Sequence, residues 1–352
     1  MGLNEKFFKT VAVPSTGGDD FAPLTYAGTG SGSKSVTGLG FQPDLVWGRS
    51  LDGTVGNILF DSIRGINKQI STDNSSAQVT RSSTAYIFDS DGFTVTTAGN
   101  LNNANDFVAW SWLASTSQTN NAGSNGATIA STIRKNVAKG FSIITYEGTG
   151  SSGSYAHGLS SAPELVFTKN IDWGIPDWFA WHSDLNANEF LRLSTAVGKA
   201  TASSVFGTAP TSTLLYQGGD SGVSRSGNTQ ITYAFHSLVN YQQISTYTWG
   251  QSSYTAGSMV SGLSFKPGFV MIKRLDGSGN WFMFDKLRGN GAQRYAAYAD
   301  DNAPQSTDGY QSIGFDDSGF SAIQSSDGHT TGSDGLNKNG VEYLYFAISE
   351  DA

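Results

Sequence analysis

The chain has 352 residues, of which 14% are charged, 12% are aromatic and 43 are glycine, and it has no cysteine. The missing cysteines exclude disulfides, cysteine-ligated zinc and thiol nucleophiles, and the aromatic content excludes an intrinsically disordered chain. The net charge of −8 argues against a nucleic-acid partner, because binding of phosphates needs clustered Lys and Arg. Long stretches rich in Ala, Leu, Glu and Lys are missing, so an all-β protein with many turns remains.

Residues 1–23 precede any repeated pattern. They contain the apolar side chains Phe7, Phe8, Val11 and Val13. We interpret the segment as an N-terminal arm that binds a neighbouring protein; the alternative is a frayed end that covers an exposed edge strand. The segment lacks the long apolar core of a signal peptide, and no apolar run of the chain is long enough for membrane insertion. We therefore expect synthesis in a cytoplasm.

A domain-sized internal repeat is the strongest signal in the chain. The copies read TGLGFQPDLVW at 37–47, HGLSSAPELVF at 157–167 and SGLSFKPGFVM at 261–271. They lie roughly 100 residues apart, which is too far for propeller blades of roughly 40 to 50 residues.

Further landmarks accompany each copy in the same order. A tyrosine segment precedes it at 24–30, 144–150 and 245–251, and an aromatic segment closes it at 107–112, 231–237 and 343–349. Between them stand LFDSIRG at 59–65 and MFDKLRG at 283–289, then FDSDGF at 88–93 and FDDSGF at 315–320. The middle copy has FAWHSDL at 179–185 and no counterpart of FDSDGF.

Short apolar segments separated by Gly, Asn, Asp and Ser are typical of β-sandwiches and jelly rolls. We predict an all-β fold of three tandem β-sandwich (jelly-roll-like) modules of about 100 residues with an N-terminal arm. The predicted boundaries are the docking arm at 1–23, module 1 at 24–115, a linker at 116–139, module 2 at 140–239 and module 3 at 240–352. Because residues 115–128 are polar and small, we expect them to be flexible and module 1 to be loosely attached. Residues 129–137 are expected to form a short β-like or weakly helical piece that leads into module 2.

The chain offers little that is typical of catalysis. Among four histidines, only His182, beside Trp181 and Asp184, has a plausible acid–base neighbourhood. The other repeats have Asp61 and Asp285 in its place, so we interpret His182 as a hydrogen-bonded structural histidine. We predict no enzymatic activity, no catalytic residue, no cofactor and no metal site.

Two charged patterns have a structural and a functional interpretation. The acidic loops at 89–91 and 316–318 carry oxygens of the kind that bind Ca²⁺, but they lack the closing Glu of a calcium loop, so hydrogen-bonded turns are favoured. Asp61 with Arg64 and Asp285 with Arg288 have the same spacing in two repeats. We interpret each as an ion pair that holds a loop, with a binding cleft as the alternative.

A cluster of tryptophans in the second repeat is the better functional lead. Trp173, Trp178 and Trp181 stand among acidic residues, a composition that suits stacking on a sugar ring or on a partner surface. The alternative is that these rings fill the core of module 2. The two interpretations differ in whether the rings are exposed.

Together, the repeated motifs resemble a known family. GFSIITYEGTG, YAFHSLVNYQQISTYTWG and NWFMFDKLRG look like a domain common in structural proteins of tailed, especially marine, bacteriophages, often described only as tail-fibre-like. The resemblance covers residues 22–352, with the first repeat as another copy of the module. It implies a location in the virion and implies no catalytic residues.

From the resemblance and the low charge we expect a non-enzymatic virion structural protein, either a capsid decoration (cement) protein or a surface appendage. The expected partners are other virion proteins of capsid or tail, and a homotrimer is one expected assembly. The first alternative is a tail fibre that binds glycans of the host surface, and the second is a carbohydrate-binding module. A glycoside hydrolase is the third, and its mark would be a pair of buried or cleft carboxylates with a raised pKa.

Overall fold

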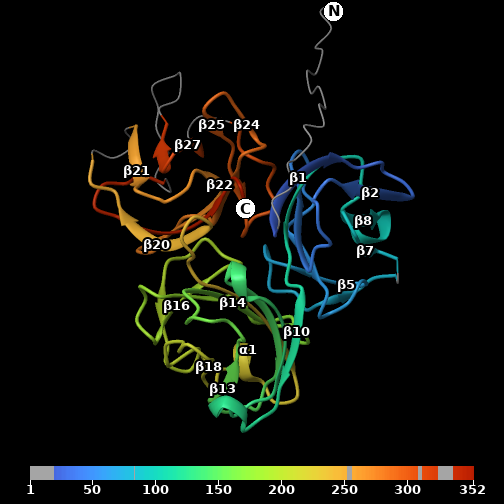
Figure 1. Cartoon of the computed structure of the whole chain (residues 1–352), viewed down its shortest axis with the longest axis vertical. Coiled ribbons are helices and arrows are strands. Elements are labelled where there is room, and N and C mark those ends of the chain that lie inside the picture. The colour runs from blue at the N-terminus through green and yellow to red at the C-terminus, as the bar shows by residue number, and fades with distance from the viewer. Residues whose placement is uncertain (1–19, 83, 252–255, 308–310, 324–335) are drawn as a thin grey trace, which may run out of the picture.

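The computed structural model describes residues 20–82, 84–251, 256–307, 311–323 and 336–352. Nearly all regular structure in these residues is antiparallel β-sheet, which confirms the all-β prediction. Figure 1 shows three lobes around a common centre, coloured blue, green to yellow, and orange to red. We name them unit 1 (20–114), unit 2 (115–239) and unit 3 (240–352).

Unit 1 consists of a six-stranded sheet in the order β1-β9-β3-β4-β5-β6 and a three-stranded sheet in the order β2-β8-β7. Its strands are β1 (Phe21–Ala27), β2 (Ser33–Thr37), β3 (Leu45–Ser50), β4 (Ile58–Asp61), β5 (Lys68–Ser71), β6 (Val79–Thr80), β7 (Tyr86–Asp89), β8 (Gly92–Thr96) and β9 (Asp106–Trp112). A 3-10 turn, η1 (Thr97–Gly99), follows β8. Every residue of β3 is buried, as its continuous apolar run predicts for a central strand.

Unit 2 consists of an eight-stranded sheet in the order β10-β11-β12-β19-β14-β15-β16-β17 and a two-stranded sheet of β13 and β18. Its strands are β10 (Thr116–Asn120), β11 (Ser131–Asn136), β12 (Phe141–Glu147), β13 (Gly153–Ala156), β14 (Leu165–Asn170), β15 (Phe179–His182), β16 (Glu189–Arg192), β17 (Ala200–Thr201), β18 (Leu214–Gln217) and β19 (Thr229–Phe235). Its short helical elements are η2 (Ser124–Gly126), η3 (Val137–Lys139) and α1 (Ser221–Ser224).

Unit 3 consists of two five-stranded sheets, in the orders β20-β29-β22-β23-β26 and β21-β28-β27-β25-β24. Its strands are β20 (Gln242–Thr248), β21 (Gly257–Ser261), β22 (Pro267–Arg274), β23 (Phe282–Asp285), β24 (Gly289–Asn290), β25 (Gln293–Arg294), β26 (Ala297–Tyr298), β27 (Ile313–Asp316), β28 (Gly319–Ala322) and β29 (Glu342–Ser349). Strand β29 pairs with β20 and β22, as β9 pairs with β1 and β3 in unit 1 and β19 pairs with β12 and β14 in unit 2.

The main sheets of the three units share one strand order. The tyrosine segment pairs with the closing aromatic segment, which pairs with the strand of the first repeat motif, as in β1-β9-β3, β12-β19-β14 and β20-β29-β22. The register also corresponds, because it sets Leu45 opposite Trp112, Leu165 opposite Phe235 and Phe269 opposite Ile348. The repeat read from the sequence is therefore a repeat of sheet topology.

The segment 116–139 differs in part from the expectation, because its polar first part also forms a strand. It contains β10 and β11, which extend the main sheet of unit 2 beyond β12, and β11 lies where a short β-like or weakly helical piece is expected. Ile129 and the inward-facing Ile133 are buried in the core, so apolar side chains hold this segment on unit 2. Arg134 pairs with Asp44 of unit 1 at 2.6 Å, so the segment also ties the first two units together.

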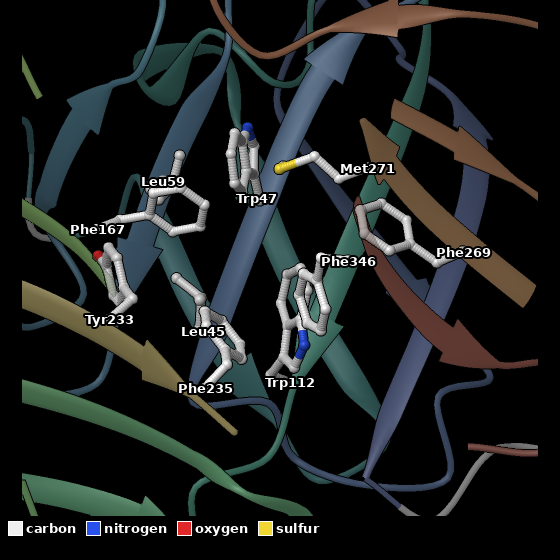
Figure 2. A pocket seen from close by; sticks show the side chains of 10 residues that line it. All are labelled: Leu45, Trp47, Leu59, Trp112, Phe167, Tyr233, Phe235, Phe269, Met271 and Phe346. Atoms are coloured by element: carbon white, nitrogen blue, oxygen red, sulfur yellow. The ribbon is translucent and has the colours of Figure 1, made fainter. Parts of the chain in front are cut away.

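Unit 1 is not loosely attached, because the largest hydrophobic cluster contains side chains of all three units. The Trp112 ring of unit 1 lies 6.3 Å from the Phe235 ring of unit 2 and 6.4 Å from the Phe269 ring of unit 3. Phe235 in turn lies 4.9 Å from Phe346 of unit 3. Figure 2 shows these side chains converging from the three main sheets.

We predict that the chain unfolds in one cooperative transition, because this central core joins all three units. Phe235→Ala should lower the free energy of unfolding of the whole chain by about 3–5 kcal/mol. Calorimetry, and urea unfolding followed by tryptophan fluorescence, measure both quantities. The control Val239→Ala, at a side chain that is 83% exposed, should change stability by less than about 0.5 kcal/mol. Separate transitions for unit 1 and for the other two would contradict the shared core.

Candidate functional site

The centre of the molecule is closed and apolar. Ten side chains from the three units surround a cavity of only about 10 Å³, which is about the volume that one water-sized probe sphere occupies (Figure 2). Its only hydroxyl-bearing side chain is Tyr233, which donates its proton elsewhere, to Asp61 at 2.7 Å. The centre is therefore a packed junction and has no room for a ligand.

Around this junction, the two predicted ion pairs are present and buried. Asp61 and Arg64 lie 2.5 Å apart, Asp285 and Arg288 lie 2.6 Å apart, and no more than 2% of any of these side chains is exposed. In each pair the other carboxylate oxygen accepts hydrogen bonds from the backbone of the following loop. The interpretation as loop-holding ion pairs is confirmed.

The sequence did not reveal that each pair faces the next unit. Asp61 accepts a hydrogen bond from the hydroxyl of Tyr233 in unit 2, and Asp285 accepts one from the indole nitrogen of Trp110 in unit 1 at 3.1 Å. Trp110 and Tyr233 stand opposite Trp47 and Phe167 in corresponding registers, so they are equivalent positions. The ion pairs thus connect unit 1 to unit 2 and unit 3 to unit 1.

In unit 2 the equivalent position is His182, which is fully buried. Its Nδ1 accepts a hydrogen bond from the backbone of Asp184 at 3.0 Å, and the Asp184 carboxylate accepts one from Thr246 of unit 3 at 3.0 Å. Burial lowers the pKa of His182 to about 4, so the ring is neutral near pH 7. These contacts agree with a structural histidine at an inter-unit contact.

The other described histidines are also buried and hydrogen-bonded. His157 donates from Nε2 to the carbonyl of Thr211 at 3.1 Å, and its Nδ1 accepts from the backbone of Leu159. Burial lowers its pKa to about 4 as well. His236 contacts the carbonyl of Ser237 through Nδ1. The Asp184 carboxylate lies 3.9 Å from Nδ1 of the buried His182, and within the described residues neither His157 nor His236 has an acid as partner.

A second set of contacts recurs between neighbouring units and involves the residue just before β4, β15 and β23. The side chain of this residue donates a hydrogen bond of 2.7 or 2.8 Å to the carbonyl of the last residue of β26, β5 or β16 in a neighbouring unit. The pairs are Asn57 with Tyr298, Trp178 with Ser71, and Trp281 with Arg192. The donors of units 1, 2 and 3 therefore reach units 3, 1 and 2.

A third set consists of buried cations at equivalent positions: Arg49, Lys169 and Lys273. Each donates to carbonyl oxygens of the neighbouring unit, at the end of β26 or in the loop that follows β26, β5 or β16. The acceptors are Tyr298, Asp301 and Ala303 for Arg49, Ser75 for Lys169 at 2.7 Å, and Ala196 for Lys273 at 2.9 Å. Burial lowers the pKa of each lysine to about 8.

Backbone hydrogen bonds close the same ring. In each unit, a backbone amide of the loop after β5, β16 or β26 donates to a carbonyl of the next unit. The acceptor is the residue just after β14, β22 or β3. The pairs are Gln78 with Ile171 at 2.8 Å, Lys199 with Leu275 at 2.9 Å, and Gln305 with Leu51 at 2.9 Å. They run from unit 1 to 2, from 2 to 3 and from 3 to 1. The chain is therefore a closed pseudo-threefold ring of head-to-tail contacts.

The predicted tryptophan platform is absent. Trp178 is fully buried and Trp181 is 5% exposed, and the half-buried Trp173 lies beneath the guanidinium of Arg225 at 4.2 Å. The core interpretation is therefore correct for Trp178 and Trp181. The tryptophan at the equivalent place in unit 3, Trp281, was the signal in the sequence that could have shown Trp178 to be an inter-unit contact.

The other predicted sites are the apolar residues of the N-terminal segment and the two acidic loops. Phe7, Phe8, Val11 and Val13 lie outside the described residues. Asp91 accepts hydrogen bonds from the backbone of Gly38 and Gly40, and Asp89 and Asp316 accept from hydroxyls of their own hairpins, as the turn interpretation requires. Within the described residues, no group of three or more His, Cys, Asp or Glu side chains is placed to hold a metal ion, and no helix is long and apolar enough to span a membrane.

Residues 16–352 match the model of a family described as Domain of unknown function (DUF7483). Because the match covers nearly the whole chain, the chain belongs to this family. No curated protein and no solved structure matches the chain. The function therefore has to be inferred from the geometry.

We predict that the contact between Tyr233 and Asp61 stabilises the ring. Tyr233→Phe should lower the free energy of unfolding by about 1–3 kcal/mol, because it removes a hydrogen bond to a buried charged carboxylate oxygen, which then keeps only Arg64 as its donor. Asp61→Asn should cost more, about 3–5 kcal/mol, because Arg64 loses its buried counter-charge. In urea unfolding the double variant should cost clearly less than the two single variants added together. Tyr216→Phe, whose hydroxyl has no partner in the described part of the chain, is the control and should be neutral.

We predict that the two buried lysines make stability rise with pH between about 8 and 9, below the range in which the tyrosines of the unfolded chain ionise. In that range the folded chain has released the protons of Lys169 and Lys273, whereas the unfolded chain, with the ordinary lysine pKa of 10.5, still binds them. Urea midpoints measured across this range should therefore increase. Each of Lys169→Met and Lys273→Met should reduce the slope, and Lys34→Met, at a lysine that is not buried, should leave it unchanged. A slope that survives in the double variant would refute the assignment.

Proposed function

We propose that this member of the DUF7483 family is a non-enzymatic structural protein of a bacteriophage particle, a capsid decoration protein or a surface appendage bound to other virion proteins. The observation that carries the proposal is the closed pseudo-threefold ring built from one chain. Three similar faces around one axis suit a position where three copies of a lattice protein meet, since each face can make a similar contact. Many weak contacts of this kind add up to firm attachment.

The chemistry of the described residues supports a structural role. The buried charged groups described above bond to the chain itself, and the histidines with lowered pKa are neutral near pH 7. Catalysis by a carboxylate pair would need two acids facing each other in a cleft, whereas Asp61 and Asp285 each face a buried arginine. Burial raises the pKa of Asp300 to about 6, and this carboxylate accepts a hydrogen bond from the backbone of Trp281 at 2.8 Å and interacts with the charge of Lys273. The resemblance of the repeated motifs to phage structural proteins points in the same direction.

The contacts between the three units also favour one oligomeric state over another. Each unit already has its inter-unit face covered by another unit of the same chain. This supports a single chain at each attachment site in preference to a homotrimer built through the same faces. Binding of host glycans by exposed tryptophans has no counterpart in the structure, so a glycan-binding role needs another surface.

Electron microscopy of purified intact particles tests the proposal. The expected result is density of the size and three-lobed shape of the ring at threefold or locally threefold positions, with the protein present among the particle proteins by mass spectrometry. Recovery of the protein only from the lysate, and not from particles, would overturn it.

We predict that the N-terminal segment attaches the ring. The described chain begins at Asp20, which contacts Asn136 and Lys139, and Phe21 packs on Phe269 of unit 3 beside the central core. The preceding nineteen residues are thus joined to the ring near its axis. Deleting residues 1–19 should lower the amount of protein on particles by at least about tenfold, the effect of ~1.4 kcal/mol.

The deletion retains Asp20, so the unfolding midpoint should stay at its wild-type value. A variant with Phe7, Phe8, Val11 and Val13 replaced by serine is the matched test at full length and should behave like the deletion. Wild-type occupancy in both variants would end the idea of a docking arm.

A further inference from the structure

The second sheet of unit 2 is incomplete in comparison with its counterparts. In unit 1 the strand β8 pairs with β2 on one side and β7 on the other, and in unit 3 β28 lies between β21 and β27. In unit 2 the equivalent sheet consists of β13 and β18 alone. The missing strand belongs to the hairpin of the FDSDGF motif, which the second repeat lacks.

An open groove lies beside these two strands. It encloses about 430 Å³ and is lined by eleven residues of β13, β18, the loop at 203–208 and Thr128. That volume is within the range of roughly 300–1,000 Å³ that is typical of small-molecule sites. It is far larger than the central cavity of about 10 Å³.

The wall of the groove carries no charged side chain, and polar and apolar atoms share it. The hydroxyls of Ser152, Ser203, Thr208 and Tyr216 line it, and none makes a hydrogen bond within the described part of the chain. Gln217 lies behind this wall, because it is 2% exposed and its Nε2 donates to Ser151 at 2.8 Å. The four hydroxyls are therefore the polar groups that a ligand in the groove would meet.

Two glycines beside the groove allow close contacts between segments, because a side chain at either position would clash with the neighbouring segment. A Cβ on Gly218 would lie 2.1 Å from the carbonyl oxygen of Ser204, and a Cβ on Gly153 would lie 2.7 Å from Ile129. Gly207 has a positive φ of 71°, which a residue with a side chain rarely adopts. The loop at 203–208 therefore takes a defined path over the edge of the sheet.

We propose that this groove binds a neutral saccharide. The four hydroxyls without internal partners match the hydroxyls of a sugar, which both donate and accept. The ring of Tyr216, half-buried on the groove wall, provides the aromatic face on which the apolar side of a sugar ring stacks. An acidic or basic ligand would find no counter-charge among the lining residues. The proposal rests on the groove alone and is independent of the proposed attachment to particles.

Ligand-observed NMR on the full chain tests the proposal with free glucose, galactose, mannose, N-acetylglucosamine, maltose and lactose as probes. At least one probe should show saturation transfer, with a dissociation constant no weaker than ~10 mM. Tyr216→Ala, which removes the stacking ring, and Thr208→Trp, which fills the groove, should each weaken binding by at least about tenfold. Thr119→Trp, at an exposed threonine of β10, is the matched control and should bind like the wild type.

A glycan array of neutral oligosaccharides distinguishes a free sugar from a surface polysaccharide as the source. Stronger binding to longer chains with the same terminal sugar would indicate a polysaccharide, and equal binding would indicate a free sugar; both support the site. Wild-type unfolding midpoints of the variants show that the fold is intact. The proposal is wrong if no probe binds, or if binding persists unchanged in Tyr216→Ala and Thr208→Trp.

Discussion

One constraint shapes the whole molecule: each repeat leaves one face of its main sheet to be covered by the other two. At the centre, the three main sheets present corresponding pairs of positions to one axis. The pairs differ in side-chain size, with Trp112 opposite Leu45 and Ile348 opposite Phe269. The remaining cavity of about 10 Å³ indicates that the sizes complement each other to the density of a protein core.

The polar contacts around this centre determine how the units are arranged. Apolar surfaces alone would allow the units to slide or rotate, because hydrophobic contact has little direction. Arg49, Lys169 and Lys273 can be buried only where carbonyl groups of the next loop meet them, since an unpaired buried cation is strongly unfavourable. We infer that these groups select one order of units at some cost in stability, as their lowered pKa values indicate.

Unit 2 makes the same contacts with its neighbours as units 1 and 3 do, but its own sheets differ most from those of the other two units. It has two additional strands, β10 and β11, at one edge of its main sheet, and it lacks the hairpin strand of its second sheet. Neither change touches the centre of the ring. A repeat protein of this kind can therefore keep its assembly unchanged while one unit acquires a surface of its own, here the open groove beside β18.

The sequence alone determined the all-β class, the repeat and the two ion pairs, because alternation and spacing along the chain are properties of local geometry. It did not determine that the ion pairs would be buried, or that 116–120 would form a strand, since this polar segment resembles a linker. It also left Trp178 open between core and exposed platform. Only the tertiary structure decided this, because an alternating strand shows which side chains share a face but not which surface that face meets, and here the covering surface lies more than a hundred residues away in the ring.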